Sequence, residues 1–234
     1  MKDCLFIDNH ILVVFKEHNI SLETFKQDIK KQLANDNLKA SYLEPILPIC
    51  AEASGLEVFA LSSKAKDRLK KQIEEKEFQT KYLAVCVGKP KENNNIFYVE
   101  STDETFEINP ERFVHINPKT EKLEYIPRLN KDSFSINSQY KFLEEKDKIS
   151  LVQVCGGFNH MQEVRFVLAD AKSPVFGDKL YGGDSLAKNT NLALTLVEIK
   201  MKHPVTNKSL VFQVYPNVDK KPWSYLNVEK YLRI

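Results

Sequence analysis

The sequence lacks the features of a secreted or membrane-spanning protein. No apolar run among its 234 residues approaches the ~20 residues that a membrane-spanning helix requires. The first residues, Met-Lys-Asp-Cys-Leu-Phe-Ile-Asp, reach acidic side chains too early for a signal peptide. We therefore expect no membrane attachment, and a location in the cytoplasm or in an organelle matrix.

Paired cysteines and a strong net charge are also missing. The four cysteines form no C-x-x-C pair and lie too far apart for a metal-binding knuckle, so we expect reduced thiols and no metal site. The formal net charge is only +2, which is too weak for a dedicated DNA-binding domain but permits a local basic face. The length suffices for one sizeable core, and we expect a monomer with a single domain over residues 1–234.

Apolar runs separated by turn residues predict an α+β fold on a mostly antiparallel sheet with a few helices. Apolar residues recur at helical spacing after two capping positions, Ser21 and either Ser62 or Ser63. A buried strand is expected over residues 82–87, and residues 164–169 fit a helix or a strand. Hairpins are expected at three places: residues 4–15, 140–154 and 192–215.

Residues 89–138 form the least regular part of the sequence. Asn-Pro pairs and an Asn-Asn-Asn run punctuate several short strand-like pieces. We expect a surface excursion with two or three edge strands and no separate domain.

The helix expected after Ser62 carries a basic face. Such a face is most often only solvated. The alternative is contact with RNA phosphates, which closely spaced basic side chains can provide. The residues concerned are Lys64, Lys66, Arg68, Lys70 and Lys71.

Residues 43–60 contain the stretch around which the sequence is organised. A turn-rich first half leads through Ser54-Gly55 into an apolar run that predicts a buried strand. A loop before a core strand is a common place for a catalytic side chain. Cys50 is the residue best placed for display there, and Glu52 follows two positions later.

Five segments carry known patterns in a fixed order along nearly the whole chain. Residues 5–16 are similar to (I/L)-Y-E-D-(D/N)-H-(I/L)-L-V-V-N-K-P, and residues 174–182 are similar to P-I-V-G-D-P-L-Y-G. Residues 192–194 and 203–212 match L-A-L and H-P-(V/F)-T-(G/N) followed by L-x-F, and residues 81–84 fit a strand with a tyrosine. Together they resemble the RluA/RluD-type RNA pseudouridine synthases.

That resemblance implies a catalytic domain with a bent, mixed sheet and a central cleft for a flipped uridine, without an S4-like RNA-binding domain. It implies a reaction that needs neither cofactor nor metal. A carboxylate starts breakage of the N-glycosidic bond, and the uracil turns and is rejoined through carbon. A tyrosine, here Tyr82, packs on the base, and an arginine holds the carboxylate ionised. Extruding the base costs a few kcal/mol, which stacking in the pocket must offset.

The central motif of that family, H-R-L-D-x-x-T-S-G-L, is only partly present. Ser54-Gly55-Leu56 anchors it without a gap, which places Cys50 at the catalytic aspartate and replaces the arginine by Pro48 and the histidine by Leu47. The apolar framework is kept while the polar site residues are lost. Cys50 is therefore expected to be inactive, because a thiol is mostly neutral at pH 7 and a carboxylate is ionised.

The second motif, T-G-R-x-H-Q-I-R, aligns with residues 158–165 and retains only Arg165 in identity. Without a carboxylate at Cys50, Arg165 is expected to pair with another acid, to face solvent or to bind phosphate. Tyr82 is expected to be a core aromatic, and His160 a loop histidine. The opening N-K-P has become Phe15-Lys16-Glu17.

Three hypotheses follow for function. The favoured one is a non-catalytic family member that acts as an RNA-binding factor, for rRNA or tRNA, or as a ribosome- or protein-associated factor. The second is an active synthase that uses Glu52 or an unusual site, because in an extended segment Glu52 would share a side with Cys50. It would still be displaced by ~6–7 Å along the backbone. The third is a scaffold without RNA contact.

Overall fold

The structure, a computed structural model, divides into two compact units. Unit 1 comprises Met1–Lys81 and Thr195–Pro216, and unit 2 comprises Tyr82–Leu194 and Asn217–Ile234. The boundaries fall inside strands β5 and β11, and the expectation of a single domain stays a prediction. The described residues are 3–38, 41–91, 112–127, 131, 133–136, 138–156, 161–183 and 190–232.

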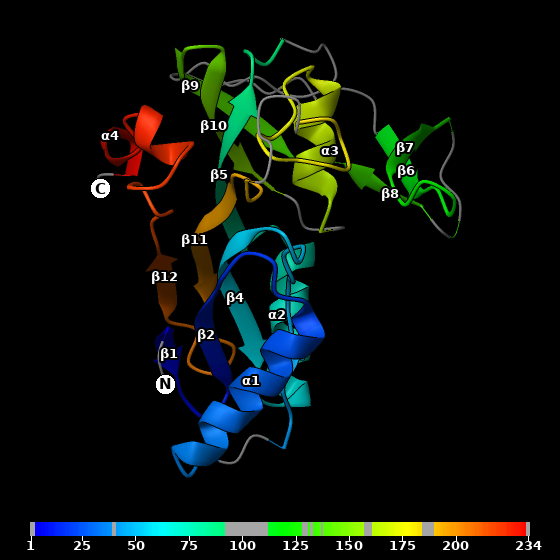
Figure 1. The fold of residues 1–234 in the computed structure, drawn as a ribbon. Coiled ribbons are helices and arrows are strands. Elements are labelled where there is room, and N and C mark those ends of the chain that lie inside the picture. The colour runs from blue at the N-terminus through cyan, green and yellow to red at the C-terminus, as the bar shows by residue number, and fades with distance from the viewer. Residues whose placement is uncertain are drawn as a thin grey trace. The chain divides into compact units, whose positions relative to one another are not determined.

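Unit 1 is a sheet with two helices (Figure 1). The strand order is β1-β2-β4-β11, with β12 paired to β11 and β3 paired to β4. All these pairings are antiparallel except that of β4 with β11, which is parallel. The elements are β1 (Cys4–Ile7), β2 (Ile11–Lys16), α1 (Leu22–Asn35), β3 (Glu44–Pro45), β4 (Ser54–Ala60), α2 (Ser63–Glu74), β11 (Leu194–Lys202) and β12 (Ser209–Gln213).

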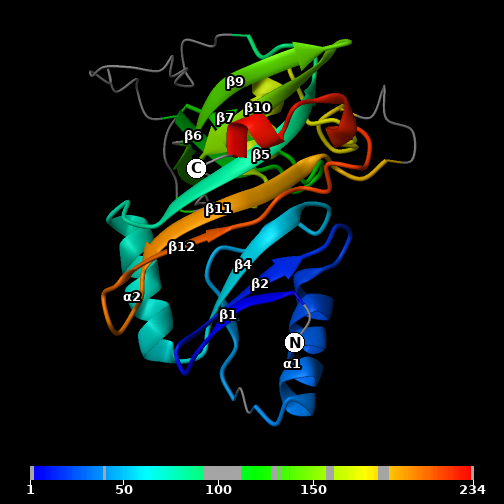
Figure 2. The same ribbon diagram turned by 90° about the vertical axis from the view of Figure 1, so that its left-hand side faces the viewer.

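Unit 2 contains the strands β5-β10-β9 in that order and a separate sheet of three short antiparallel strands, β7-β6-β8. Figure 2 shows the β9–β10 hairpin beside β5. The elements are β5 (Gln79–Val87), β6 (Arg112–Ile116), β7 (Leu123–Ile126), β8 (Ser133–Ile136), β9 (Gln139–Lys146), β10 (Ile149–Cys155), α3 (Glu163–Asp170), a 3₁₀ turn (Trp223–Tyr225) and α4 (Glu229–Leu232).

The local predictions from the sequence are largely confirmed. The three hairpins form, and the hydroxyls of Ser21 and Ser62 cap α1 and α2 by accepting hydrogen bonds from backbone N–H groups. The segment left open as a helix or a strand is the helix α3. Its first six residues are all buried, which explains why no one-sided apolar stripe marked it as a helix.

The short strands expected in residues 89–138 form, but they do not lie at the edge of the larger sheet. The three strands found there pair with one another in a sheet of their own. This small sheet packs against α3, because the Tyr125 ring lies 5.0 Å from that of Phe166 and its hydroxyl donates a hydrogen bond to Asp170. Residues 92–111, which include the Asn-Asn-Asn run, lie outside the described part.

Two hairpin turns of unit 1 are tied together by a buried histidine. Asp8 Oδ1 accepts backbone hydrogen bonds within the β1–β2 turn, from His10 and Ile11. Asp8 Oδ2 lies 2.7 Å from His203 Nε2, and His203 Nδ1 faces the N–H of Thr206 in the β11–β12 turn. Asp8 belongs to the first matched pattern, residues 5–16, and His203 to the last, residues 203–212, so the two patterns meet at this contact.

Strand β4 begins at Ser54-Gly55, and these two residues pair with the parallel strand β11. Gly55 has a φ of +131° and faces Leu196, and a Cβ at position 55 would collide with the backbone of Leu196. The Ser54 hydroxyl lies 3.0 Å from that of Thr195. Only glycine fits this close approach of two strands.

Among the described residues, no helix is long and apolar enough to span a membrane.

Gly55→Ala is expected to lower the free energy of unfolding by roughly 2–4 kcal/mol, because strain in φ and a collision with fixed backbone add together. Gly88→Ala is the matched control: Gly88 also has a positive φ, +72°, but no atom lies within 4 Å of an added Cβ. That control should lose only about 1 kcal/mol. Urea unfolding of both variants measures the difference, and equal losses would contradict the packing argument.

Candidate active site

The loop before β4 is held by a buried lysine on β2. Lys16 is 1% exposed, and its ammonium donates to the carbonyl oxygens of Ala53 at 2.7 Å and Ala51 at 3.0 Å. It also donates to Glu17 and Ile20 at 3.1 and 3.3 Å, in the segment that leads to α1. Burial lowers the pKa of Lys16, whereas nearby acidic groups, Glu57 first among them, raise it. One side chain therefore fixes two loops.

A buried glutamate holds the same loop from β4. Glu57 is 0% exposed, and its Oε1 accepts a hydrogen bond of 2.9 Å from the backbone N–H of Ile49. Among the described groups, its Oε2 has no hydrogen-bond partner. Burial raises the pKa of Glu57 to about 8, although the Ile49 N–H and Lys16 act in the opposite direction.

Strand register explains why these two side chains meet. Lys16 is paired with Gly55, and Val14 with Glu57, so Lys16 and Glu57 are diagonal neighbours on one face of the β2–β4 pair. Val14 belongs to the apolar cluster with Ile29 of α1, so this is the face that α1 covers. The sequence interpretation missed both residues. The available signals were Lys16 at the end of one buried apolar run and Glu57 inside another.

Cys50 lies in a tight turn of the loop before β4, the loop that Lys16 and Glu57 hold. It is 3% exposed, and its carbonyl accepts a hydrogen bond of 3.2 Å from the N–H of Ala53. The premise that residues 50–52 are extended is therefore wrong, and Glu52 does not share a strand side with Cys50. Glu52 is exposed, and its carbonyl oxygen lies 2.9 Å from His18 Nδ1. A catalytic role for Glu52 loses its geometric support.

Arg165 lies on α3 in unit 2 and pairs with an acid, as one of the three expected outcomes stated. It is 3% exposed, and its Nε and Nη2 donate to the two oxygens of Asp178 at 2.8 and 2.6 Å. Asp178 also accepts the backbone N–H groups of Leu180 and Tyr181 at 2.9 and 3.0 Å. The carboxylate is thus fully used by a bidentate pair and two loop amides.

Tyr181 covers this ion pair. The Arg165 guanidinium lies 5.6 Å from the centre of the Tyr181 ring. The Tyr181 hydroxyl donates to Gln162 at 2.8 Å and accepts from the N–H of Leu123 at 2.9 Å. The matched Gly-Asp-Lys-Leu-Tyr-Gly loop therefore joins α3 to the small sheet.

The remaining expected site residues are placed as follows. Tyr82 on β5 is 5% exposed, and its contact with a base stays a prediction. His160 lies outside the described residues. The part of the chain that the structure describes contains no group of three or more side chains suited to hold a metal ion.

The basic face of α2 is partly neutralised within unit 1. Lys66 lies 3.7 Å from Glu44, and Lys71 lies 3.5 Å from Glu75. Arg68 donates to the carbonyl oxygen of Pro204 at 2.5 Å. Lys64 and Lys70 are exposed. RNA binding by this face stays a prediction, with fewer available charges than the sequence indicated.

Replacing Glu57 by glutamine should remove a pH dependence of stability. The carboxyl ionises near 4.5 when unfolded and near 8 when folded, so folding opposes loss of its proton. The contribution of Glu57 to stability therefore falls as the pH rises through this window. A glutamine side chain cannot ionise and can still accept from the N–H of Ile49. As the pH rises toward 8, the free energy of unfolding of the variant should increase relative to that of the wild type by up to several kcal/mol. Urea unfolding at a series of pH values measures this difference. A difference in the free energy of unfolding that stays constant over this pH range would contradict the prediction.

Breaking the buried pair in unit 2 should be costly on either side. Arg165→Met and Asp178→Asn should each lower the free energy of unfolding by about 3–5 kcal/mol, because each leaves a buried polar group without its partner. The double variant Arg165→Met/Asp178→Asn should lose much less than the sum of the two single losses. Lys71→Met, which breaks an exposed pair, is the control and should cost under about 0.5 kcal/mol. Additive losses in denaturant titrations would contradict a coupled pair.

Comparisons with known proteins agree with the motifs. Residues 10–169 match the family model described as RNA pseudouridylate synthase. RNA pseudouridine synthase YhcT of Bacillus subtilis is 25% identical over 218 residues, which cover 89% of this chain and 67% of that protein. Dual-specificity RNA pseudouridine synthase RluA of Haemophilus influenzae is 24% identical over 216 residues, covering 90% and 91%.

Solved structures show the same fold. Human RNA pseudouridylate synthase domain containing 1 has a TM-score of 0.68 at 14% identity and covers 94% of this chain and 85% of its own. Human RNA pseudouridylate synthase domain containing 4 also has a TM-score of 0.68, at 16% identity, and covers 92% and 89%. The α+β fold with a mostly antiparallel sheet is thereby confirmed. The chain belongs to the RNA pseudouridylate synthase family and is of the RluA type.

Proposed function

We propose that this chain binds RNA through the family fold without isomerising uridine. The observation that carries the proposal is the thiol of Cys50, which stands where the family pattern has its catalytic aspartate. The thiol is buried in a turn, 3% exposed. A neutral thiol provides neither the charge nor the two acceptor oxygens of a carboxylate.

The two neighbouring glutamates do not replace that aspartate. Glu52 is exposed on the turn, and in catalysis a misplacement of ~1 Å can cost about 100-fold in rate. The Glu57 side chain is buried beneath the loop, where its carboxyl group accepts a hydrogen bond from the backbone N–H of Ile49. With its pKa raised to about 8, Glu57 is mainly protonated at neutral pH.

Arg165 is stable without a carboxylate from the Cys50 loop. Asp178 neutralises its guanidinium through two hydrogen bonds inside unit 2. A buried arginine that lost its only acid would destabilise the protein. This pairing supports a fold that persists without the catalytic carboxylate, and RNA binding is the family property that we propose it retains.

The test is to incubate the purified chain with in vitro transcribed rRNA and tRNA, which carry no modification, and to map pseudouridine and ultraviolet crosslinks. We expect crosslinks without pseudouridine. Pseudouridine that forms at a defined site and disappears in Glu52→Gln or Glu57→Gln would overturn the proposal in favour of an active synthase. Absence of both crosslinks and product would favour a scaffold without RNA contact.

A further inference from the structure

Five exposed lysines gather at one end of unit 2. Backbone hydrogen bonds bring their segments together: the N–H of Gly88 donates to Lys148 at 2.7 Å, and that of Lys91 donates to Ala171 at 2.9 Å. The end of β5, the β9–β10 turn and the end of α3 therefore meet here. This surface, the lysine end, consists of Lys89, Lys91, Lys146, Lys148 and Lys172.

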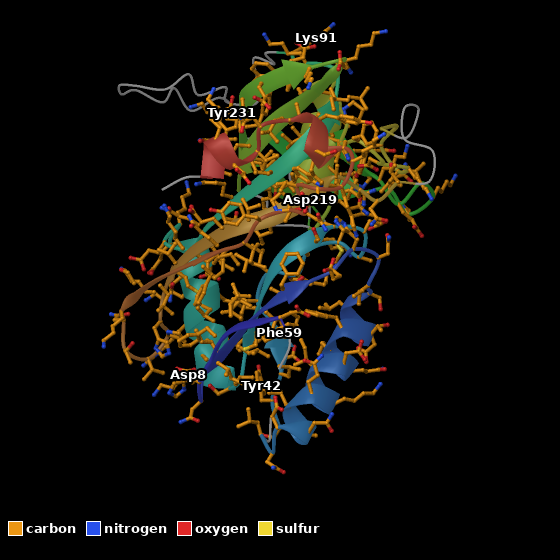
Figure 3. All side chains as sticks on the ribbon, turned by 60° about the vertical axis from the view of Figure 1, so that its left-hand side comes forward. Asp8, Tyr42, Phe59, Lys91, Asp219 and Tyr231 are labelled. Atoms are coloured by element: carbon orange, nitrogen blue, oxygen red, sulfur yellow. The ribbon has the colours of Figure 1, made fainter. Side chains whose placement is uncertain are left out.

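The backbone under the lysine end is firmly held. The Tyr140 hydroxyl donates to the carbonyl oxygen of Lys91 at 2.7 Å. The carbonyl oxygen of Gly88 accepts from the hydroxyls of Ser150 and Ser173, at 2.6 and 3.1 Å. Figure 3 shows Lys91 at the outer edge of unit 2. Fixed main-chain positions keep the charges close together before any partner binds, which lowers the ordering cost of binding.

The charges of the lysine end are available, in contrast to those of α2. None of its five lysines has an acidic partner within 4 Å among the described residues. Lys89 lies 4.6 Å from the centre of the Phe142 ring, which holds its position without cancelling its charge. Glu145 and Asp147, beside Lys146 and Lys148, are exposed acids that offset two of the five charges, so the surface keeps an excess of three positive charges.

We propose that the lysine end binds the phosphate backbone of RNA. This inference rests on the proposed function and assigns that function to a surface. Lysine ammonium groups recognise phosphates as point charges and do not read base edges. Binding here is therefore tolerant of sequence and strongly dependent on salt, because each phosphate contact releases bound counterions.

The experiment measures binding of fluorescein-labelled, mixed-sequence single-stranded RNA by anisotropy over a series of salt concentrations. The test variant is Lys91→Gln/Lys148→Gln/Lys172→Gln. The control variant, Lys30→Gln/Lys208→Gln/Lys220→Gln, removes the same charge from exposed positions elsewhere. Circular dichroism and urea unfolding establish that both variants are folded.

The test variant should bind roughly tenfold or more weakly, with a salt slope that is smaller by roughly 2, whereas the control stays close to the wild type. If the wild type binds RNA and both variants behave alike, the assignment of the lysine end is wrong while the proposed function stands. If the wild type does not bind RNA, the proposed function fails and the lysine end fails with it.

Discussion

The shape of the Cys50 loop depends on a buried lysine and a buried glutamate beneath it. Lys16 and Glu57 are diagonal neighbours on β2 and β4, and their hydrogen bonds to the loop go to its backbone groups. Taking two ionisable groups out of water is unfavourable unless hydrogen bonds replace the lost hydration. Lys16 has four carbonyl partners, so its cost is largely offset. Hydrogen bonds to backbone groups can form whatever side chains the loop carries.

The match to the family pattern is uneven along this stretch. The positions that supply polar chemistry, including Pro48 and Cys50, differ from the pattern, whereas the Ser54-Gly55 pivot and the strand after it are kept. In unit 2 the same separation holds, because Arg165 has its acid in Asp178. Lys16 and Arg165 thus each find their hydrogen-bond partners within their own unit.

The sequence predicted those elements of the fold that depend on interactions between residues close together in the chain. Turn residues and capping serines located the hairpins and helices, because Ser21 and Ser62 act on backbone groups three residues away. The motif resemblance predicted the family. The sequence did not show that residues 50–53 form a turn, that Asp178 is the partner of Arg165, or that Lys16 and Glu57 meet. Those facts depend on strand register and on contacts between distant segments, which a single sequence does not encode locally.

The basic character of the chain illustrates the same limit. The sequence placed a positive face on α2, where charges recur at helical spacing. The structure neutralises part of that face with Glu44 and Glu75. The lysines of unit 2 come from segments more than 80 residues apart, as Gly88 and Ser173 show, and only the fold brings them together.

The parallel pairing of β4 with β11 has a consequence for how the protein folds. Ser54 and Thr195 are 141 residues apart, so the meander β1-β2-β4 is complete in the nascent chain long before its neighbour has been translated. Until then the edge of β4 at Ser54 and Gly55 lacks its β11 partner, because β3 covers only the other end of that edge. Closing so long a loop is slow, and an open edge invites pairing with other chains. We therefore expect this short stretch of β4 to be exposed to pairing with other chains until β11 has been synthesised.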